Sequence, residues 1–588
     1  MSIEKKGIAV SHGFCYGSIV LLNQARTLVE KRKIKKNEIF NEISRLQVAV
    51  EKSINEVSNL KHNSDYGLKS EHIDILDFNI LILEDEILAS EVIQKIKNDS
   101  INAEWALNDV LTSKSRNFAN IKDIYMQERL ADFYYIGERI VKNLRGANDH
   151  SLEIKNNSIL VAHDLSPIDT LKYCQSDKVK GILTDLGGTT SHTAIIARSL
   201  SIPAIMSLHD ISHTLRPGQR AYVDGYKGIV TWKTNKEQKV QMESLRSEYL
   251  LLEENLLEFS KLNGQTNDGV RVSVKANIEI TSELNSAIRY GAEGIGMYRT
   301  EFLFTSKDRF PTEDEQFEDY KKLLNTNQFN EATIRTLDIG GDKVKNLNIE
   351  ESNPALGLRG IRYSLANIEI FERQLRAIFR VCAEEEKRIR ILLPMISNID
   401  EINKANEIID QTNKDFMVSN FYTVGVVIET PSAAILADEI SNHVDFISIG
   451  TNDLLQYILA ADRTNENLRD LMSYYQPSVI KTIKQIKDNV GNQKYISICG
   501  EMASDILSLP LFIGLGFNEL SMNSHSIPII KSAMNELSSI ECKEIVNICL
   551  DCQKASEIEE ILRKFINDKI LKAKNLIKYE ISVSYTHL

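Results

Sequence analysis

Residues 424–459 read VGVVIETPSAAILADEISNHVDFISIGTNDLLQYIL, and this stretch contains two copies of the unit from which the predicted C-terminal domain is built. Its two short apolar runs, VGVVIE and FISIGT, are each followed by a segment with the apolar spacing of an amphipathic helix. Six similar runs occur after residue 263, namely VSVKANI, GIGMYR, TIRTLDIG, RILLPM, YISICG and ELSMN. Eight β/α units in about 310 residues match the count and length of a (β/α)8 TIM barrel. The sequence therefore predicts such a barrel over residues 263–578.

The N-terminal part of the chain combines β-rich and helical segments. The first 22 residues predict a strand, a turn and a second strand, and short β-rich runs return from residue 151 around the helix HTAIIARSL. Residues 24–144 lack Pro and carry apolar residues at helical spacing, which predicts several long amphipathic helices. We therefore expect one α/β domain, residues 1–23 and 145–232, whose chain is interrupted by an all-helical insertion at 24–144.

Length, charge and Cys content indicate a multidomain protein that does not span a membrane. A chain of 588 residues predicts about three or four domains. Its net charge of −12 gives no overall electrostatic reason to bind nucleic acid or an anionic membrane. No apolar run approaches the ~20 residues that span a bilayer, and the N-terminus has no signal-peptide core. Seven Cys at irregular spacings do not form a disulfide framework, so we expect a reducing, cytoplasmic location.

Two shorter segments lie outside the predicted domains. Residues 233–262 are polar and helical in pattern, which predicts a helical linker. Residues 579–588 form a tail after the last predicted helix, and its final six residues, VSYTHL, match what a common sequencing adapter can encode. We therefore treat residues 583–588 as candidates for non-native read-through and leave them out of the fold.

The segment from Asp185 to Arg198, DLGGTTSHTAIIAR, carries the first candidate catalytic residue. An apolar strand ends in a Gly-Gly turn, and Thr190 or Ser191 can cap the helix that follows. His192 then lies in the first helical turn, beside unpaired backbone N–H groups that form an anion site. A neutral imidazole there can accept a phosphoryl group. A histidine that merely caps a helix would give the same local pattern.

Polar residues also follow five of the eight predicted barrel strands, where TIM barrels place their active sites. Guanidinium groups suit phosphate or carboxylate, and two carboxylates facing an anionic ligand suit Mg²⁺ between them. The thiol of Cys499 could deliver a proton, although a free Cys usually packs as a hydrophobic residue. The candidates are Arg299, Arg335 and Arg463 for an anion, Glu429 and Asp453 for the metal, and Cys499 for the proton, and Asn452 is a further polar residue at a strand end.

Longer motifs resemble one family. GGTTSHTAIIARSLSIPAI resembles the phosphohistidine signature of enzymes that use phosphoenolpyruvate. GIGMYRTEFLF, IRTLDIGGDK, NPALGLRGIR, VVIETPSAA, DFISIGTNDLLQYILAADR and SICGEMA follow in order. Together these motifs are similar to Enzyme I of the bacterial sugar phosphotransferase system, the phosphoenolpyruvate–protein phosphotransferase, over essentially the whole chain except the tail.

The resemblance implies a reaction and a set of partners. His192 would attack the phosphorus of phosphoenolpyruvate with Mg²⁺ present, pyruvate would leave, and the phosphoryl group would pass to the phosphocarrier protein HPr. Arg299 and Arg335 would hold the phosphate, with Asn452 and Arg463 completing substrate binding. Glu429 and Asp453 would ligate the metal, and Cys499 would protonate the enolate. HPr would dock on the helical insertion, and the family is a homodimer through the barrel. The candidate docking residues are Leu81, Leu83, Glu84 and Arg129.

The chain departs from the family pattern in three places. Thr189 stands where the signature commonly has Arg, and Ser166 stands where Thr is frequent. The first turn reads Ser11-His12-Gly13, where the family often has Pro before the Gly. A paralogue of the nitrogen branch remains an alternative, although that type usually carries an additional sensory domain. Pyruvate phosphate dikinase and phosphoenolpyruvate synthase would need a large ATP-binding domain. A non-catalytic docking protein is the alternative from another class, and labelling with phosphoenolpyruvate distinguishes it.

Overall fold

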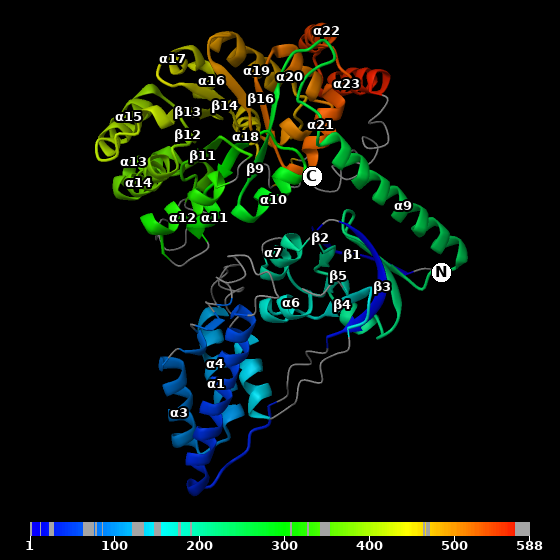
Figure 1. Cartoon of the computed structure of the whole chain (residues 1–588), viewed down its shortest axis with the longest axis vertical. Helices are drawn as coiled ribbons and strands as arrows, with labels where there is room; N and C mark the ends of the chain where they lie inside the picture. The colour runs from blue at the N-terminus through cyan, green and yellow to red at the C-terminus, as the bar shows by residue number, and fades with distance from the viewer. Residues whose placement is uncertain are drawn as a thin grey trace. The chain divides into compact units, whose positions relative to one another are not determined.

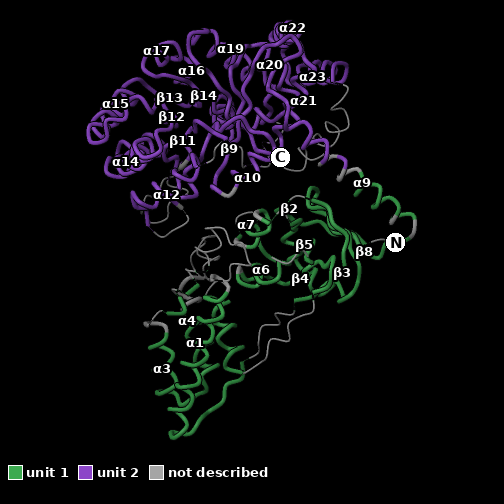
Figure 2. The backbone as a smooth tube through the Cα atoms, viewed as in Figure 1, with its two compact units in different colours: residues 1–250 green, residues 251–588 purple. Residues whose placement is uncertain are grey.

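The computed structural model divides into two compact units, residues 1–250 and 251–588 (Figure 2). It describes residues 3–11, 13–22, 29–62, 76, 79–80, 82–84, 86–119, 135–145, 154–174, 178–188, 191–200, 202–305, 309–325, 328–340, 353–462, 465, 468 and 471–570. Within these ranges no helix combines the length and the apolar character needed to cross a membrane.

The first unit contains an eight-stranded mixed sheet with the order β1-β8-β7-β3-β4-β5-β6-β2 (Figure 1). Strands β3 to β6 run parallel, and the other pairs are antiparallel. The strands are β1 (Ile3–Lys6), β2 (Ile8–Ser11), β3 (Phe14–Leu21), β4 (Ser158–Ala162), β5 (Val179–Thr184), β6 (Ala204–Met206), β7 (Arg220–Asp224) and β8 (Ile229–Trp232). Strand β3 precedes the helical segment and β4 follows it, and the two pair along Ser18–Leu21.

The sequence pattern missed β1 because this strand is polar. Its residues, IEKK, are largely exposed and pair only with β8 at one edge of the sheet. Charged side chains are typical of edge strands, which are protected in this way from pairing with other chains. An apolar alternation, which identifies half-buried strands, is therefore absent here.

Helices of the first unit form two groups. One group covers the sheet with α6 (Pro167–Cys174) and α7 (His192–Ser199) on one face and the short α8 (Ile211–Thr214) on the other. The other group is all helical and comprises α1 (Ile39–His62), α3 (Glu86–Asp99), α4 (Ala103–Ala119) and residues 135–144. Apolar side chains of α6 and α7 also belong to the buried cluster of this helical group. The predicted α/β fold with a helical insertion is therefore confirmed.

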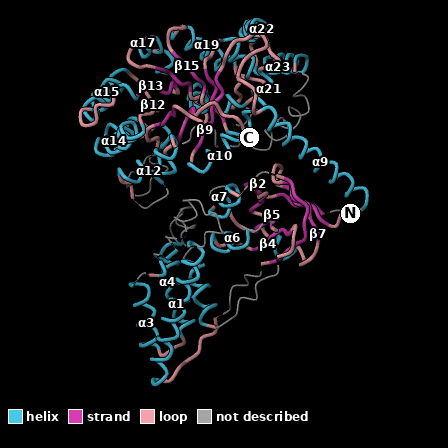
Figure 3. Tube along the Cα trace, viewed as in Figure 1, coloured by secondary structure: helices cyan, strands magenta, loops and turns pink. Residues whose placement is uncertain are grey.

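The second unit is a closed barrel of eight parallel strands surrounded by helices (Figures 1 and 3). Its strands are β9 (Ser273–Ile278), β10 (Ile295–Arg299), β11 (Glu331–Arg335), β12 (Arg388–Leu393), β13 (Tyr422–Ile428), β14 (Phe446–Ile449), β15 (Tyr495–Ile498) and β16 (Glu519–Met522). Each strand overlaps one of the eight runs identified in the sequence, so the predicted TIM barrel is confirmed. The long helix α9 (Lys236–Phe259) precedes the first strand.

Local signals explain where the barrel helices begin. Thr430 caps α16 with its side chain, and Pro431 occupies the first helical turn. Thr312 and Asn398 cap α12 and α15 in the same way, each with a Glu three residues later. The helices are α10 (Leu284–Arg289), α11 (Glu301–Thr305), α12 (Glu313–Leu324), α13 (Ile361–Ala366), α14 (Ile368–Glu385), α15 (Ile399–Asn413), α16 (Pro431–Ile435), α17 (Ala437–Ser441), α18 (Thr451–Leu459), α19 (Pro477–Val490), α20 (Leu509–Leu515), α21 (Ile527–Met534), α22 (Ser539–Asp551) and α23 (Ala555–Lys569).

Most apolar residues of the second unit form one cluster between the strands and their helices. Strands such as β14, whose four residues are all buried, read as continuous apolar runs because a barrel strand is covered on both faces. A smaller buried cluster is made by Met297, Leu392, Val427 and Phe446 of four strands, together with Cys499, which directly follows β15 at the mouth. Side chains of this kind fill the interior of a small barrel. The interior is therefore packed, and functional side chains are confined to its ends.

Candidate active site at the barrel mouth

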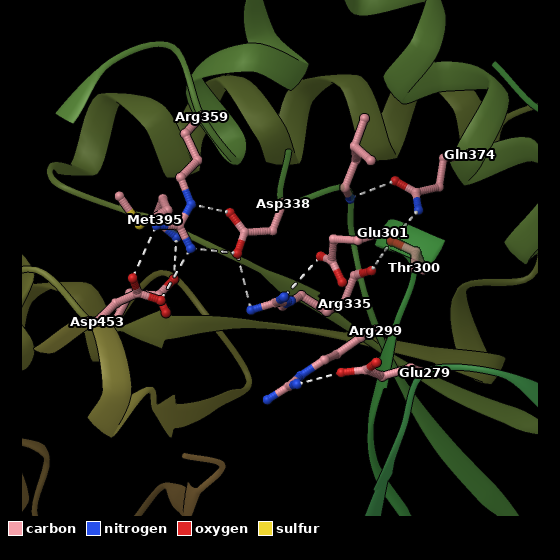
Figure 4. A network of polar contacts seen from close by, with 12 residues as sticks. Glu279, Arg299, Thr300, Glu301, Arg335, Asp338, Arg359, Gln374, Met395 and Asp453 are labelled. Carbon is pink, nitrogen blue, oxygen red and sulfur yellow. Dashed lines mark hydrogen bonds and ion pairs between the residues drawn. The ribbon is translucent and has the colours of Figure 1, made fainter. Parts of the chain in front are cut away.

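The carboxyl ends of the barrel strands carry a connected network of charged side chains (Figure 4). Arg299 is the last residue of β10, and Arg335 is the last residue of β11. Glu429 follows β13 directly, and Asp453 lies in the first turn of α18 after β14. Since parallel strands end at the same rim of a barrel, residues far apart in the sequence lie together here.

Arg335 is held by two carboxylates. Its Nη2 donates to Oε1 of Glu301 at 2.8 Å, and its Nη1 lies 3.2 Å from Oδ2 of Asp338. The backbone carbonyl of Arg335 accepts a hydrogen bond from Thr300 Oγ1 at 3.0 Å. The buried Nε of Arg335 has no hydrogen-bond partner among the residues that the structure describes. An unpaired buried donor is costly unless a ligand satisfies it, so this arginine can bind an additional anionic oxygen.

Arg359 links two further carboxylates and was not identified in the sequence. Its Nε and Nη2 donate to the two oxygens of Asp338 at 2.9 and 3.0 Å. Its Nη1 and Nη2 donate to the two oxygens of Asp453 at 3.0 and 3.1 Å. Arg359 precedes α13 rather than following a strand, so the strand-end pattern does not include it. Its presence in the motif NPALGLRGIR was the available signal.

Glu429 is a buried carboxylate in this network. Its Oε1 accepts a hydrogen bond from the Met395 backbone N–H at 2.7 Å. Burial, and after it the negative charges of Asp453 and Asp338, raises the pKa of Glu429 to about 8. A Cβ at Gly450 would lie 2.6 Å from Oε2 of Glu429, so the glycine gives this carboxylate its space. A cation bound among the carboxylates of Glu429, Asp453 and Asp338 would reduce their mutual repulsion.

The donor set suits Mg²⁺ only together with a ligand. Within the described ranges, no group of three or more His, Cys, Asp or Glu side chains is arranged to hold a metal ion. Sites that handle phosphate commonly hold Mg²⁺ through one or two carboxylates, with substrate oxygens and water as the other ligands. Glu429 and Asp453, mutually repulsive and buried, fit that pattern.

The other predicted mouth residues have separate partners. Arg299 Nη1 donates to Oε1 of Glu279 at 2.6 Å. Asn452 donates to Oε1 of Glu501 at 3.2 Å and accepts from the Glu501 backbone N–H at 2.9 Å. The thiol of Cys499 donates to the Ile449 carbonyl at 3.5 Å. Burial raises the pKa of the Cys499 thiol to about 11, which keeps it protonated near neutral pH.

His192 opens α7 in the first unit. Ser191 is its N-cap, and the Ser191 Oγ accepts from the Ala194 backbone N–H at 3.3 Å. The Thr193 hydroxyl donates to the Leu165 carbonyl at 2.9 Å, which ties the first turn of α7 to the residue before Ser166. Ser166 in turn caps α6 by accepting from the Asp169 backbone N–H at 3.0 Å. The start of α7 is therefore firmly positioned.

Several predicted residues fall outside the described parts of the chain. These are Leu81, Arg129, Thr189 and Arg463, together with the side chain of His192. Of the predicted docking residues that are described, Leu83 is buried in the apolar core of the helical group and Glu84 is exposed.

Comparisons with known proteins cover nearly the whole chain. Family models match residues 6–129 (PEP-utilising enzyme, N-terminal), 154–228 (PEP-utilising enzyme, mobile domain) and 253–539 (PEP-utilising enzyme, PEP-binding domain). A phosphoenolpyruvate-protein phosphotransferase of Staphylococcus aureus is 36% identical over 575 residues, covering 96% of this chain and 100% of its own.

Further relatives carry the same name. Proteins of Listeria monocytogenes and Mycoplasma capricolum are each 36% identical, over 96% and 97% of this chain and 100% of their own. A solution structure of a protein described as Enzyme I is 30% identical, covers 42% of this chain and 99% of its own, and has a TM-score of 0.35. From the family models and the full-length relatives, the chain belongs to the phosphoenolpyruvate-protein phosphotransferases, a family of PEP-utilising enzymes.

Proposed function

We propose that the chain transfers the phosphoryl group of phosphoenolpyruvate to His192 and then to a histidine of HPr, the first step of sugar uptake by the phosphotransferase system. The observation that carries this proposal is the pairing of arginines with buried carboxylates at the barrel mouth. Phosphoryl transfer needs in-line positioning and stabilisation of charge more than covalent help from the protein. Guanidinium groups supply both for a phosphate.

The substrate contacts follow from the positions of the mouth residues. Arg299 and Arg335 bind the phosphate of phosphoenolpyruvate, with the unpaired Nε of Arg335 supporting this role. Asn452 and Arg463 complete substrate binding. After the phosphorus–oxygen bond breaks, the pyruvate enolate takes a proton on carbon from Cys499. The raised pKa of that thiol supports the assignment, because the proton is present whenever the enolate forms.

Mg²⁺ is the cofactor that this proposal includes. Glu429 and Asp453 would hold it, and it would neutralise negative charge on the substrate oxygens. Glu429 keeps one oxygen on the Met395 backbone N–H, which fixes the orientation of its carboxylate. The wall formed by Gly450 leaves room for the second oxygen of Glu429.

The transfer from one substrate to the next requires His192 to reach two sites. The linker at residues 233–262, which contains α9, would act as the hinge between the barrel and the α/β domain at 1–23 and 145–232. The helical insertion at 24–144 would dock HPr through residues 81–88, where Glu84 is exposed, and through Arg129. We further propose a cytoplasmic homodimer formed through the barrel at 263–578.

Labelling with phosphoenolpyruvate tests this function. The full chain, Mg²⁺ and phosphoenolpyruvate labelled at phosphorus should give an acid-labile, base-stable label, as expected of a phosphoramidate. His192→Ala should take up no label and transfer none when HPr is added. His163→Ala is the matched control, because His163 is exposed at the end of the neighbouring strand β4, and it should label normally. Label in the His192→Ala protein, or none in the wild type, would overturn the proposal.

A further inference from the structure

Arg359 forms bidentate contacts with two carboxylates at once (Figure 4). One edge of its guanidinium, Nε and Nη2, bonds to Asp338, and the other, Nη1 and Nη2, bonds to Asp453. The three side chains are 10%, 1% and 9% exposed, respectively, so water screens these contacts little. A buried carboxylate without a cation is unfavourable, and Arg359 supplies that cation to both.

The same Asp453 oxygens are those that the proposed metal site requires. Both oxygens of Asp453 accept from Arg359 at 3.0 and 3.1 Å. A bound Mg²⁺ lies roughly 2.0–2.1 Å from each ligand oxygen. A divalent cation on Asp453 and the guanidinium in its present place would thus be close neighbours of like charge. The two cations therefore compete for this carboxylate.

The contact with Asp338 would let Arg359 leave Asp453 without losing every carboxylate partner. Nε of Arg359 donates to Oδ1 of Asp338 at 2.9 Å, and this bond does not involve Asp453. Rotation about this contact can remove Nη1 from Asp453 while the arginine keeps a buried carboxylate partner. An anionic ligand at the mouth would give the displaced N–H groups new acceptors, because guanidinium groups bind phosphate and carboxylate oxygens.

We propose that Arg359 is an internal counter-cation that occupies Asp453 and exchanges with the divalent metal there, so that metal binding is weak until an anion draws Arg359 away. This inference rests on the proposed function, because it takes Asp453 as a metal ligand. It assigns Arg359 a role in the order of loading that differs from a contact with substrate. The coupling is reciprocal, so the metal also strengthens binding of the anion.

Binding of Mn²⁺ to the full chain, followed by electron paramagnetic resonance without phosphoenolpyruvate, tests the exchange independently of turnover. Arg359→Met should bind Mn²⁺ tighter than the wild type, on the order of tenfold, a typical size for coupled sites. Arg359→Lys keeps the charge but lacks the planar fork, so its affinity should lie between the two. Addition of inorganic phosphate should tighten Mn²⁺ binding to the wild type and change Arg359→Met less.

Arg335→Met is the matched control, because it removes a positive charge from the same network and leaves the contact between Arg359 and Asp453 in place. Arg335 is an equally buried arginine of the same network, and it bonds to Glu301 and Asp338 but not to Asp453. Its loss should raise Mn²⁺ affinity much less than the loss of Arg359. Equal effects of the two substitutions would overturn the exchange, as would an unchanged affinity in both Arg359 variants.

Asp453→Asn separates failure of the inference from failure of the metal assignment. If Asp453→Asn abolishes Mn²⁺ binding while Arg359→Met leaves the wild-type affinity, the exchange is wrong and the metal site stands. If Asp453→Asn binds Mn²⁺ as the wild type does, the metal assignment and the exchange both fall. Circular dichroism confirms folding of each variant, and Arg359→Met should gain more thermal stability from Mn²⁺ than the wild type does.

Discussion

Glu519→Gln should destabilise the barrel strongly, because Glu519 neutralises two buried cations at the end of the barrel opposite the active site. Its Oε2 lies 2.6 Å from Lys275 Nζ and 2.9 Å from Arg390 Nη1. Glu519 is 1% exposed, and the side chains of Lys275 and Arg390 are 10% and 6% exposed. The guanidinium of Arg390 also lies over the Phe446 ring, 4.0 Å from its centroid.

The expected cost follows from removing one member of a buried ionic group. Gln has the shape of Glu but no charge. Among the ion pairs of the described residues, Lys275 and Arg390 would then keep the one with Glu331, which is 38% exposed and lies 3.4 and 3.8 Å away. Losing one partner of such a group costs about 3–5 kcal/mol. At about 2.1 cal/mol/K of unfolding entropy per residue, this corresponds to a fall of roughly 4–7 °C in the melting temperature of the second unit.

Differential scanning calorimetry of the full chain measures this shift. Glu331→Gln is the matched control and should cost less than about 1 kcal/mol, because its carboxylate is partly exposed and more distant. If the melting temperature of Glu519→Gln falls no further than that of Glu331→Gln, Glu519 does not neutralise the two cations in the way described.

The pH dependence provides a second check on Glu519. Burial acts to raise its pKa, but the charges of Arg390 and Lys275 outweigh burial and lower the pKa below the ordinary 4.5. The stabilisation is therefore complete above pH 4.5 and is lost as the pH falls through the lowered pKa. The difference between wild type and Glu519→Gln should stay constant from pH 5 to 8 and shrink in acid. A difference that instead grows toward low pH would contradict this assignment of charge.

Three further outcomes are expected. The pKa of the Cys499 thiol is raised to about 11, so a fraction of about 10⁻³ of this thiol should be ionised at pH 8. Iodoacetamide should therefore alkylate Cys499 roughly a hundredfold more slowly than a thiol of ordinary pKa 9.0. Mass spectrometry should show that the alkylation rate is still rising at pH 10. Gly450→Ala places a methyl group against Glu429 and should slow labelling by phosphoenolpyruvate on the order of 10²-fold; an unchanged rate would show that Glu429 moves freely. Asp185→Asn removes a buried carboxylate oxygen that accepts hydrogen bonds from Ser212 and His163. The free energy of unfolding of the first unit in urea, followed by tryptophan fluorescence, should fall by about 1–3 kcal/mol. An unchanged midpoint urea concentration would contradict that role.

The strand-end residues of the candidate site could be found from the sequence for a simple reason. Arg299 and Glu429 close the runs GIGMYR and VGVVIE, and Arg335 lies in the run TIRTLDIG, where β11 ends. The ends of parallel strands meet at one rim. Once the eight runs predict a barrel, these three residues are expected at the same rim. Arg359 has no such position, and its contact with Asp453 joins residues 94 positions apart.

The edge strand β1 is a feature of the fold that the local sequence pattern does not reveal. Its polar sequence carries no alternation, and only the pairing of Ile3–Lys6 with β8 makes it a strand. In contrast, the boundaries of helices such as α16 could be read locally from Thr430 and Pro431. Predictions succeeded where neighbours in the chain supply the signal, and failed where distant partners supply it.

The number and order of the β/α units, and the chemical groups that follow the strands, were determined by the amino-acid sequence alone. These features depend on apolar periodicity and on capping residues, which act between residues close in the chain. Which cation neutralises which buried carboxylate, and in particular that Arg359 binds Asp453, depends on the packing of the folded barrel. The physical reason is that Coulomb and hydrogen-bond energies depend on distances between atoms that the chain brings together only when the barrel closes.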